Sequence, residues 1–308
     1  MWHGILVVHK ERGMTSHQVV AVLRRMLKQS EAGHTGTLDP EATGVLVVGL
    51  GQATRSFSFL NEDCKVYRGE IILGQSTDTQ DATGQVIQEC PDTRVEMEVL
   101  RKAMDGLTGT INQIPPMFSA VKVHGQKLYD LARKGVTIDR TPRVIEVTQW
   151  EVLNPRESYG FRDSVIVEIT CSKGTYIRTL IHDLGACLGT GAHMGELIRL
   201  RSGKFDLDQS LTISEIENHL KMGTLHSRLI TLGEALDHLP SMQPSPEDVL
   251  KILHGGKISF QKYPCDSPPG SYAKFLNNLL QVIAIAQLTP DNTGTYLYWQ
   301  PVKVFHYL

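Results

Sequence analysis

Residues 33–48 read GHTGTLDPEATGVLVV, a polar segment that leads into an apolar one. Three glycines and one proline in its first twelve residues predict a loop with an unusual backbone path. Asp39 stands directly before Pro40, which restricts its backbone to an extended conformation and could present its carboxylate to a cleft. The local sequence alone slightly favours the alternative, an Asx-type turn in which the Asp39 side chain bonds only the backbone.

Other chemistry for this loop has less support. His34, Asp39 and Glu41 could serve as metal ligands, but their spacing matches no HExxH, His-rich or Cys/His pattern, so we expect no metal site. A glycosidase-like pair of Asp39 and Glu41 is a further alternative, although residues two apart in a loop need not converge. The segment GLGQAT at 49–54 lacks the third glycine of a dinucleotide loop and the lysine of a P-loop, which argues against nucleotide binding.

The segments around the loop show strand and helix patterns without a regular βαβ repeat. Strands are expected at 5–8, 45–48, 65–73, 143–153 and 163–171, with one or two more at 108–123. Helices are expected at 19–27, with Ser16 as N-cap, and at 94–105, 126–134 and 175–188. This pattern predicts an α+β fold with a mixed, mostly antiparallel sheet.

A proline cluster, LPSMQPSP at 239–246, predicts a domain boundary. Beyond it, short strand patterns at 280–286 and 302–307 are separated by turn residues. We therefore expect one domain at 1–238 and a small β-rich domain at 239–308.

The composition is that of an ordinary globular chain, with 308 residues, 41% of them hydrophobic and 21% charged. The N-terminus shows no signal-peptide pattern, and no stretch is apolar over a bilayer-spanning length. The five cysteines are scattered and form no CxxC pair, which argues against a disulfide framework or a zinc ribbon. We expect a cytoplasmic protein with reduced thiols.

The formal net charge of −2 argues against a general polyanion binder, but it hides opposed segments. Residues 121–143 carry +4, whereas residues 76–105 carry −4 and residues 205–250 carry −6. Residues 197–204 add three basic side chains and no acid. A single stretch of like charges usually forms a solvent-exposed face. Two basic stretches that converged in the fold would instead form a groove that binds phosphates.

A second polar motif, CSKGTYIRTL at 171–180, joins the end of a strand to the start of a helix. With Thr175 as N-cap, Tyr176 and Arg178 would lie in the first helical turn. An arginine there opposes the helix dipole, so we expect Arg178 to have a specific partner. A buried carboxylate is the natural one, because a guanidinium binds it bidentately and keeps it ionised. The default alternative is an exposed helical arginine.

Taken together, several blocks resemble the bacterial tRNA pseudouridine synthase family called TruB. In chain order they are GILVVHKERGMTSHQVV at 4–20, GHTGTLDPEATGVL at 33–46, KVYRGEIILG at 65–74, TDTQDATG at 77–84, QIPPMFSAVKVHGQKLYDLARKG at 113–135, CSKGTYIRTLIHDLG at 171–185 and GAHMGELIRLRSGKF at 191–205. The tail, with LKILHGGKIS at 250–259 and PVKVF at 301–305, is similar to PUA-type RNA-binding domains. The resemblance therefore implies a pseudouridine synthase fold followed by a PUA-like domain.

The resemblance also implies an activity, the isomerisation of the uridine at position 55 in the T loop of tRNA to pseudouridine, without metal or organic cofactor. Asp39 falls at the position of the catalytic aspartate. It could attack C6 of the base, or attack or deprotonate the sugar, and the sequence leaves these routes open. Every route needs an ionised carboxylate, which makes Arg178 the expected salt-bridge partner of Asp39.

By the same resemblance, Tyr67, Tyr176 and Leu197 contact the target base, and Tyr67 also serves proton transfer at C5. Ordinary core packing is the alternative for these three residues. His34 falls at the position of a residue that stacks in the RNA loop. The target base must flip out of its stack, at a cost of a few kcal/mol that RNA contacts recover.

Residues 121–143 match a basic insertion that grips the tRNA elbow in this family. The candidate phosphate-binding residues are Lys122, Lys127, Arg133, Arg143 and, from the second basic run, Arg199. The implied partner is tRNA, with a monomer as the family expectation and no membrane contact. A tRNA-binding or RNA-folding chaperone with a secondary catalytic role is the alternative function.

Overall fold

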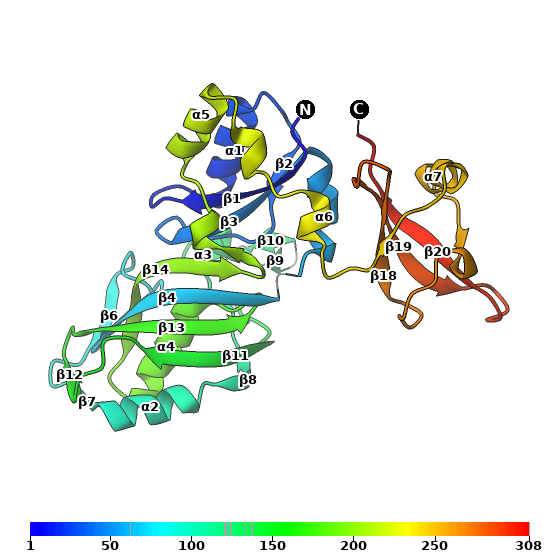
Figure 1. The fold of residues 1–308 in the computed structure, drawn as a ribbon. Helices are drawn as coiled ribbons and strands as arrows, with labels where there is room; N and C mark the ends of the chain where they lie inside the picture. Colours follow the sequence, from blue (N-terminus) through cyan, green and yellow to red (C-terminus); the bar gives the residue numbers. More distant parts are fainter. Residues whose placement is uncertain (62, 120–121, 124, 133, 137, 308) are drawn as a thin grey trace. The chain divides into compact units, whose positions relative to one another are not determined.

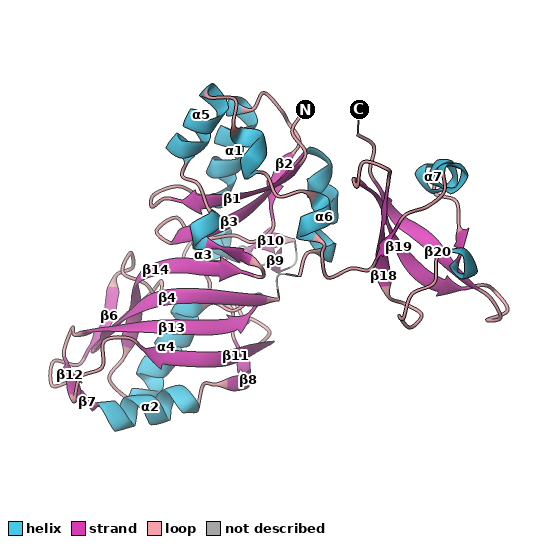
Figure 2. Cartoon of the chain, in the orientation of Figure 1, coloured by secondary structure: helices cyan, strands magenta, loops and turns pink. Residues whose placement is uncertain are grey.

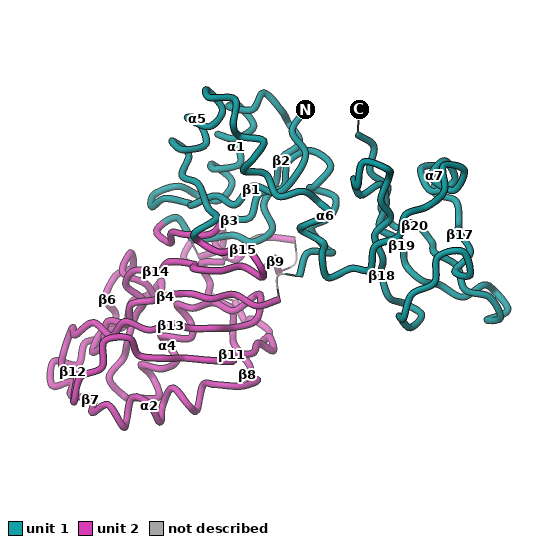
Figure 3. The backbone as a smooth tube through the Cα atoms, viewed as in Figure 1, with its two compact units in different colours: residues 1–40, 46–61, 208–308 teal, residues 41–45, 62–207 magenta. Residues whose placement is uncertain are grey.

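The computed structural model describes the whole chain except residues 62, 120–121, 124, 133, 137 and 308. It contains two compact units (Figure 3): unit 1 comprises residues 1–40, 46–61 and 208–308, and unit 2 comprises residues 41–45 and 62–207. Helices and strands are mixed in both, and the strands are mostly antiparallel (Figure 2), which confirms the expected α+β class. Among the described residues, no helix has the length and apolar character needed to span a membrane.

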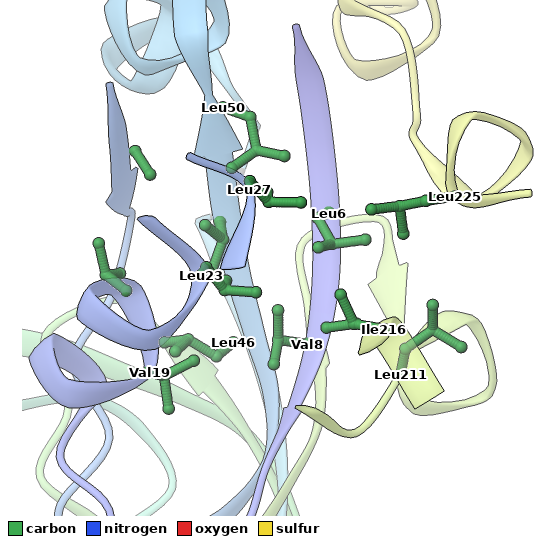
Figure 4. Close-up of a cluster of buried hydrophobic side chains, with 13 residues drawn as sticks. Leu6, Val8, Val19, Leu23, Leu27, Leu46, Leu50, Leu211, Ile216 and Leu225 are labelled. Carbon is green, nitrogen blue, oxygen red and sulfur yellow. The ribbon is translucent and has the colours of Figure 1, made fainter. Parts of the chain in front are cut away.

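The first part of unit 1 combines elements from two separate stretches of the chain, residues 4–59 and 207–235. Its elements are β1 (Gly4–Lys10), α1 (Ser16–Met26), β2 (Ala32–His34), β3 (Thr43–Leu50), η1 (Gly51–Phe59), η2 (Leu207–Gln209, which starts in unit 2), α5 (Ile213–Lys221), η3 (Leu225–Arg228) and α6 (Leu232–Ala235). Strands β1 and β2 both neighbour β3, and β2 pairs with it antiparallel. Apolar side chains from β1, α1, β3 and α5 form the core between them (Figure 4).

Helix α1 begins one residue earlier than expected. Thr15, and not Ser16, is the N-cap: its side chain accepts the Gln18 N–H, and the Gln18 side chain bonds the Thr15 backbone in return. The prediction of Ser16 as cap was wrong because the Ser16 hydroxyl bonds Leu38, far along the chain.

The last part of unit 1 is rich in strands, as expected. It contains β16 (Ser241–Met242), α7 (Pro246–Leu253), β17 (Ile258–Ser259), η4 (Phe260–Lys262), β18 (Tyr272–Leu276), β19 (Val282–Pro290) and β20 (Leu297–Val304). Five strands form one sheet in the order β16-β18-β19-β20-β17, with its own core around Trp299 and Phe275. The contact-based units divide the chain elsewhere, so the boundary near residue 239 stays a prediction.

Unit 2 is built on one sheet, ordered β14-β4-β13-β11-β8 (Figure 1). Its elements are β4 (Cys64–Leu73), β5 (Gln75–Thr77), β6 (Val86–Glu89), β7 (Arg94–Glu96), α2 (Met97–Asp105), β8 (Gly109–Gln113), β9 (Lys122–Val123), β10 (Gln126–Lys127), α3 (Leu128–Ala132), β11 (Arg143–Val152), β12 (Ser158–Gly160), β13 (Ser164–Ser172), α4 (Ile177–Leu188), β14 (Ala192–Ser202) and β15 (Phe205–Asp206). Helix α4 contacts β4 and β14. Buried and half-exposed residues alternate along β13, as in a sheet with one covered face.

Helix α4 follows the sequence pattern at its end but not at its start. Gly189 closes it in the left-handed conformation at φ 71°, directly after the expected last helical residue, 188. The N-cap is Tyr176 rather than Thr175, and no side chain of its own caps the helix. The Thr175 hydroxyl donates instead to the Ser172 carbonyl at 2.9 Å, so the predicted cap was wrong.

Candidate active site

The turn that carries Asp39 is held from the segment that joins β1 to α1. The Ser16 hydroxyl accepts the N–H of Leu38 at 2.9 Å and donates to its carbonyl at 3.2 Å. On the other side, the Lys10 ammonium donates to the Pro40 carbonyl at 2.8 Å. Lys10 and Ser16 are buried. The backbone on both sides of Asp39 is therefore fixed in unit 1 before a substrate binds, which is the condition for effective positioning of a reacting carboxylate.

His34, at the end of β2, contacts a second histidine. The His17 Nδ1 atom lies 3.0 Å from His34 Nε2, and the two rings are tilted by 59°. One ring nitrogen donates and the other accepts, so the tautomers of the two rings are linked. His17 was not identified as a site residue from the sequence, although the expected helix placed it in the first helical turn.

In unit 2, Arg178 lies in the first turn of α4 and is 5% exposed. Its Nη1 atom is 3.3 Å from Asp81 Oδ2, and its Nη2 donates to the Phe118 carbonyl at 2.6 Å. Asp81 is thus a carboxylate partner of the kind that the sequence predicted for Arg178. The residue itself was missed, although it lies in the polar TDTQDATG block. The pairing of Arg178 with Asp39 stays a prediction.

The Asp81 carboxylate is held in one orientation by its own loop. Oδ1 accepts the Thr79 hydroxyl at 2.8 Å and both the N–H and the hydroxyl of Thr83, at 3.0 and 2.5 Å. Oδ2 remains for Arg178, and the two side chains are only 14% and 6% exposed. The guanidinium is therefore held by two acceptors, Asp81 and the Phe118 carbonyl, and water screens so buried an ion pair little.

The expected base-contact residues Tyr67, Leu197 and Tyr176 all belong to unit 2. Tyr67 on β4 and Leu197 on the adjacent strand β14 are each 8% exposed. Tyr176 is fixed by Gln113, which is 2% exposed. Gln113 Oε1 accepts the Tyr176 N–H at 2.8 Å, and its Nε2 donates to the Tyr176 carbonyl at 3.0 Å. Gln113 therefore supplies the capping acceptor that α4 lacks in its own sequence.

The expected phosphate-binding residues have different surroundings. Arg143 is exposed at the start of β11. The backbones of Lys122 and Lys127 pair across β9 and β10, but their side chains, and all of Arg133, lie outside the described residues. Arg199 is 2% exposed, and its Nε donates to the Val45 carbonyl at 2.7 Å. Little of this side chain is open to a phosphate in the structure, and the expected phosphate contact of Arg199 stays a prediction.

Within the described part of the chain, no three His, Cys, Asp or Glu side chains gather into a metal-binding group. The five cysteines are free. Burial raises the pKa of the Cys171 thiol to about 12, so this thiol stays protonated at neutral pH and is a poor nucleophile.

Comparison with known proteins agrees with the resemblance read from the sequence. The model of the TruB family pseudouridylate synthase (N terminal domain) matches residues 24–177, and that of the tRNA pseudouridylate synthase B C-terminal domain matches residues 178–239. A tRNA pseudouridine synthase B of Bacillus licheniformis is 41% identical over 98% of this chain and 95% of that protein. One of Bacillus thuringiensis is 44% identical over 82% of this chain and 83% of that protein.

Solved structures confirm the fold. A Cbf5-Nop10-Gar1 complex contains a chain that matches 99% of this one and 85% of its own length, with a TM-score of 0.73 and 27% identity. An H/ACA RNP bound to a substrate RNA containing 2′-deoxyuridine gives a TM-score of 0.73 and 25% identity, over 99% of this chain and 86% of that chain.

Proposed function

Because this chain belongs to the TruB family of pseudouridylate synthases, it is an isomerase that acts on tRNA, and we propose that its target is the T-loop uridine at position 55. The proposal makes Asp39 the essential carboxylate. The observation that carries it is the turn Leu38-Asp39-Pro40, whose carbonyls are held on both sides by buried side chains. Such a clamp is expected where one carboxylate must meet a reacting base or sugar in a fixed geometry.

The proposed reaction breaks the N1–C1′ bond of the uridine, turns the uracil and joins C1′ to C5. The proton on C5 leaves and N1 gains one, so no oxidant or cofactor is required. Asp39 acts as nucleophile or base in its ionised form. We propose that Arg178, whose guanidinium is already fixed by Asp81 and by the Phe118 carbonyl, holds Asp39 ionised when the substrate is bound.

The uracil itself would be held in unit 2. Tyr67 and Leu197 lie on neighbouring strands and are nearly buried, which suits an apolar slot for a flipped base. The phenol of Tyr67 would then take part in the proton transfer at C5. Tyr176, with its backbone fixed by Gln113, would close the slot from the start of α4.

RNA affinity would come from the basic segment 121–143, through Lys122, Lys127, Arg133 and Arg143. The 239–308 segment would add contacts as a PUA-like domain, and His34 would stack in the RNA loop. A local basic segment on a chain of net charge −2 favours selection of one folded RNA over general polyanion binding.

The test uses an unmodified tRNA transcript, with EDTA present, and maps pseudouridine along the product. Wild-type protein should give pseudouridine at position 55 only, and a transcript with cytidine at that position should give none. Asp39→Asn should bind the transcript and make no product. Equal product from Asp39→Asn, or product elsewhere in the tRNA, contradicts the proposal. Binding by the wild type without product would favour the RNA-chaperone function instead.

A further inference from the structure

The pairing of β14 with β4 is irregular beside Leu197. Met194 pairs with Ile71 in a regular antiparallel register. Three residues later, Leu197 pairs with Gly69, which lies only two residues from Ile71. Two residues of β14 therefore oppose a single residue of β4, Glu70. This arrangement is a β-bulge, which changes the direction of the side chains that follow it.

The bulge decides on which face of the sheet Leu197 lies. Met194 and Leu197 are three residues apart, so they would point to opposite faces in a regular strand. With the extra residue, Leu197 shares the face of Gly69 and of Tyr67, because directly opposed residues of an antiparallel pair lie on one face. A Cβ added to Gly69 would lie 3.5 Å from Leu197 Cδ1 and 3.8 Å from Ile177 Cγ2, so this is the face that α4 covers.

Glu70 lies on the other face and is bonded to the bulge. Its Oε2 accepts the N–H of Glu196, one of the two bulged residues, at 3.1 Å. Its Oε1 accepts the Ser164 hydroxyl of β13 at 2.6 Å, which anchors the carboxylate. The other bulged residue is Gly195, where a Cβ would stand 2.3 Å from Glu70 Oε2. The Glu70 carboxylate therefore accepts from the bulge at Glu196, is held by Ser164, and has room there because residue 195 is a glycine.

From this geometry we propose that Glu70 is a positioning residue of the base pocket. By holding the bulge, it keeps Leu197 on the sheet face that carries Tyr67. The inference rests on the proposed role of those two residues in holding the flipped uracil. Glu70 acts through Leu197 and does not touch the base, since it lies on the opposite face. Its loss should slow the isomerisation and leave tRNA affinity, which depends on other side chains, unchanged.

Three variants test the proposal: Glu70→Ala, Glu70→Gln and Ser164→Ala. Glu70→Ala should lower kcat on tRNA roughly tenfold to a hundredfold, as expected for a displacement of about 1 Å in a pocket, with an unchanged Kd for tRNA. Glu70→Gln can still accept the Glu196 N–H with its amide oxygen and donate to Ser164, so it should restore kcat. Ser164→Ala is the graded comparison: it removes the anchor but leaves the Glu70–Glu196 bond in place, so kcat should fall clearly less than in Glu70→Ala.

Hydrogen exchange of the peptide that contains Glu196 gives a second readout, which should be faster in Glu70→Ala only. Gly195→Ala provides an independent route, because the added methyl group displaces the carboxylate and should lower kcat as Glu70→Ala does. Wild-type kcat in a folded Glu70→Ala or Gly195→Ala protein would overturn the inference, as would equal losses in Ser164→Ala and Glu70→Ala. A wild-type protein that makes no pseudouridine in tRNA would refute the proposed function instead, so the two failures are distinguishable.

Discussion

Removing the negative charge of Asp81 tests how unit 2 holds Arg178. In Asp81→Asn, the amide oxygen can still accept from Thr79 and Thr83, whereas the contact of 3.3 Å with the guanidinium loses its charge. Breaking a fully buried ion pair costs about 3 to 5 kcal/mol. Here Arg178 keeps its bond to the Phe118 carbonyl, so we expect a loss of about 2 to 3 kcal/mol in the free energy of unfolding.

The assay is urea unfolding at pH 7, followed by fluorescence and circular dichroism, on a double-mutant cycle with Arg178→Met. The coupling free energy between Asp81 and Arg178 should be about 1 to 3 kcal/mol. Asp78→Asn, in the same loop, is the matched control: Asp78 Oδ1 accepts the Gln85 N–H at 2.8 Å, an interaction that an amide oxygen can replace. A stability for Asp81→Asn within about 0.5 kcal/mol of the wild type, or a cycle that is additive, would refute the reasoning.

Three further predictions concern polar side chains that are buried or half-buried, Gln113 in unit 2 and Lys274 and His3 in unit 1. Gln113→Leu removes both bonds to the Tyr176 backbone and should lower the free energy of unfolding by about 2 to 3 kcal/mol, measured in urea, and reduce kcat. Lys274→Met removes bonds of 2.8 Å to two carbonyls at α6 and should cost about 1 to 3 kcal/mol in the same assay. Burial, and then the N-terminal amine, lower the pKa of His3, whose Nδ1 accepts the Gln52 N–H. The unfolded chain therefore binds this proton more readily, so stability is full above pH 6.5 and falls as the pH drops through the lowered pKa. His3→Asn should reduce that fall, and an identical pH profile for variant and wild type would contradict the assignment.

Local patterns in the sequence predicted several of the long strands and helices, but they missed others, such as β14 (Ala192–Ser202), and all of the long-range hydrogen bonds. The strand at Cys64–Leu73 and the end of α4 at Gly189 follow from alternation and from glycine chemistry. The start of α1 was misplaced by one residue, because Ser16 bonds Leu38, and propensity scales contain no information about a partner so distant in sequence.

In the candidate site, too, the sequence predicted the kind of contact but not the residue that makes it. The chemistry of Arg178 predicted a buried carboxylate, and Asp81 supplies one, but only the folded loop determines which carboxylate it is. The two basic runs were read from charge alone, which does not distinguish the exposed Arg143 from the buried Arg199. The β-bulge beside Leu197 could not be predicted either. It is defined by which residues of β4 lie opposite β14, and the pattern within one strand does not give that register.

The hold of Lys10 and Ser16 on the Asp39 turn has a consequence for protein engineering. The backbone on both sides of Asp39 is held by anchors in residues 10–16, through the Ser16 hydroxyl at Leu38 and the Lys10 ammonium at Pro40. We therefore expect substitutions at the exposed Thr37 to leave the Asp39 backbone in place. When exposed positions of the loop are redesigned, Lys10 and Ser16 must therefore be kept together with Asp39 and His34, because the anchors hold the backbone that presents the carboxylate.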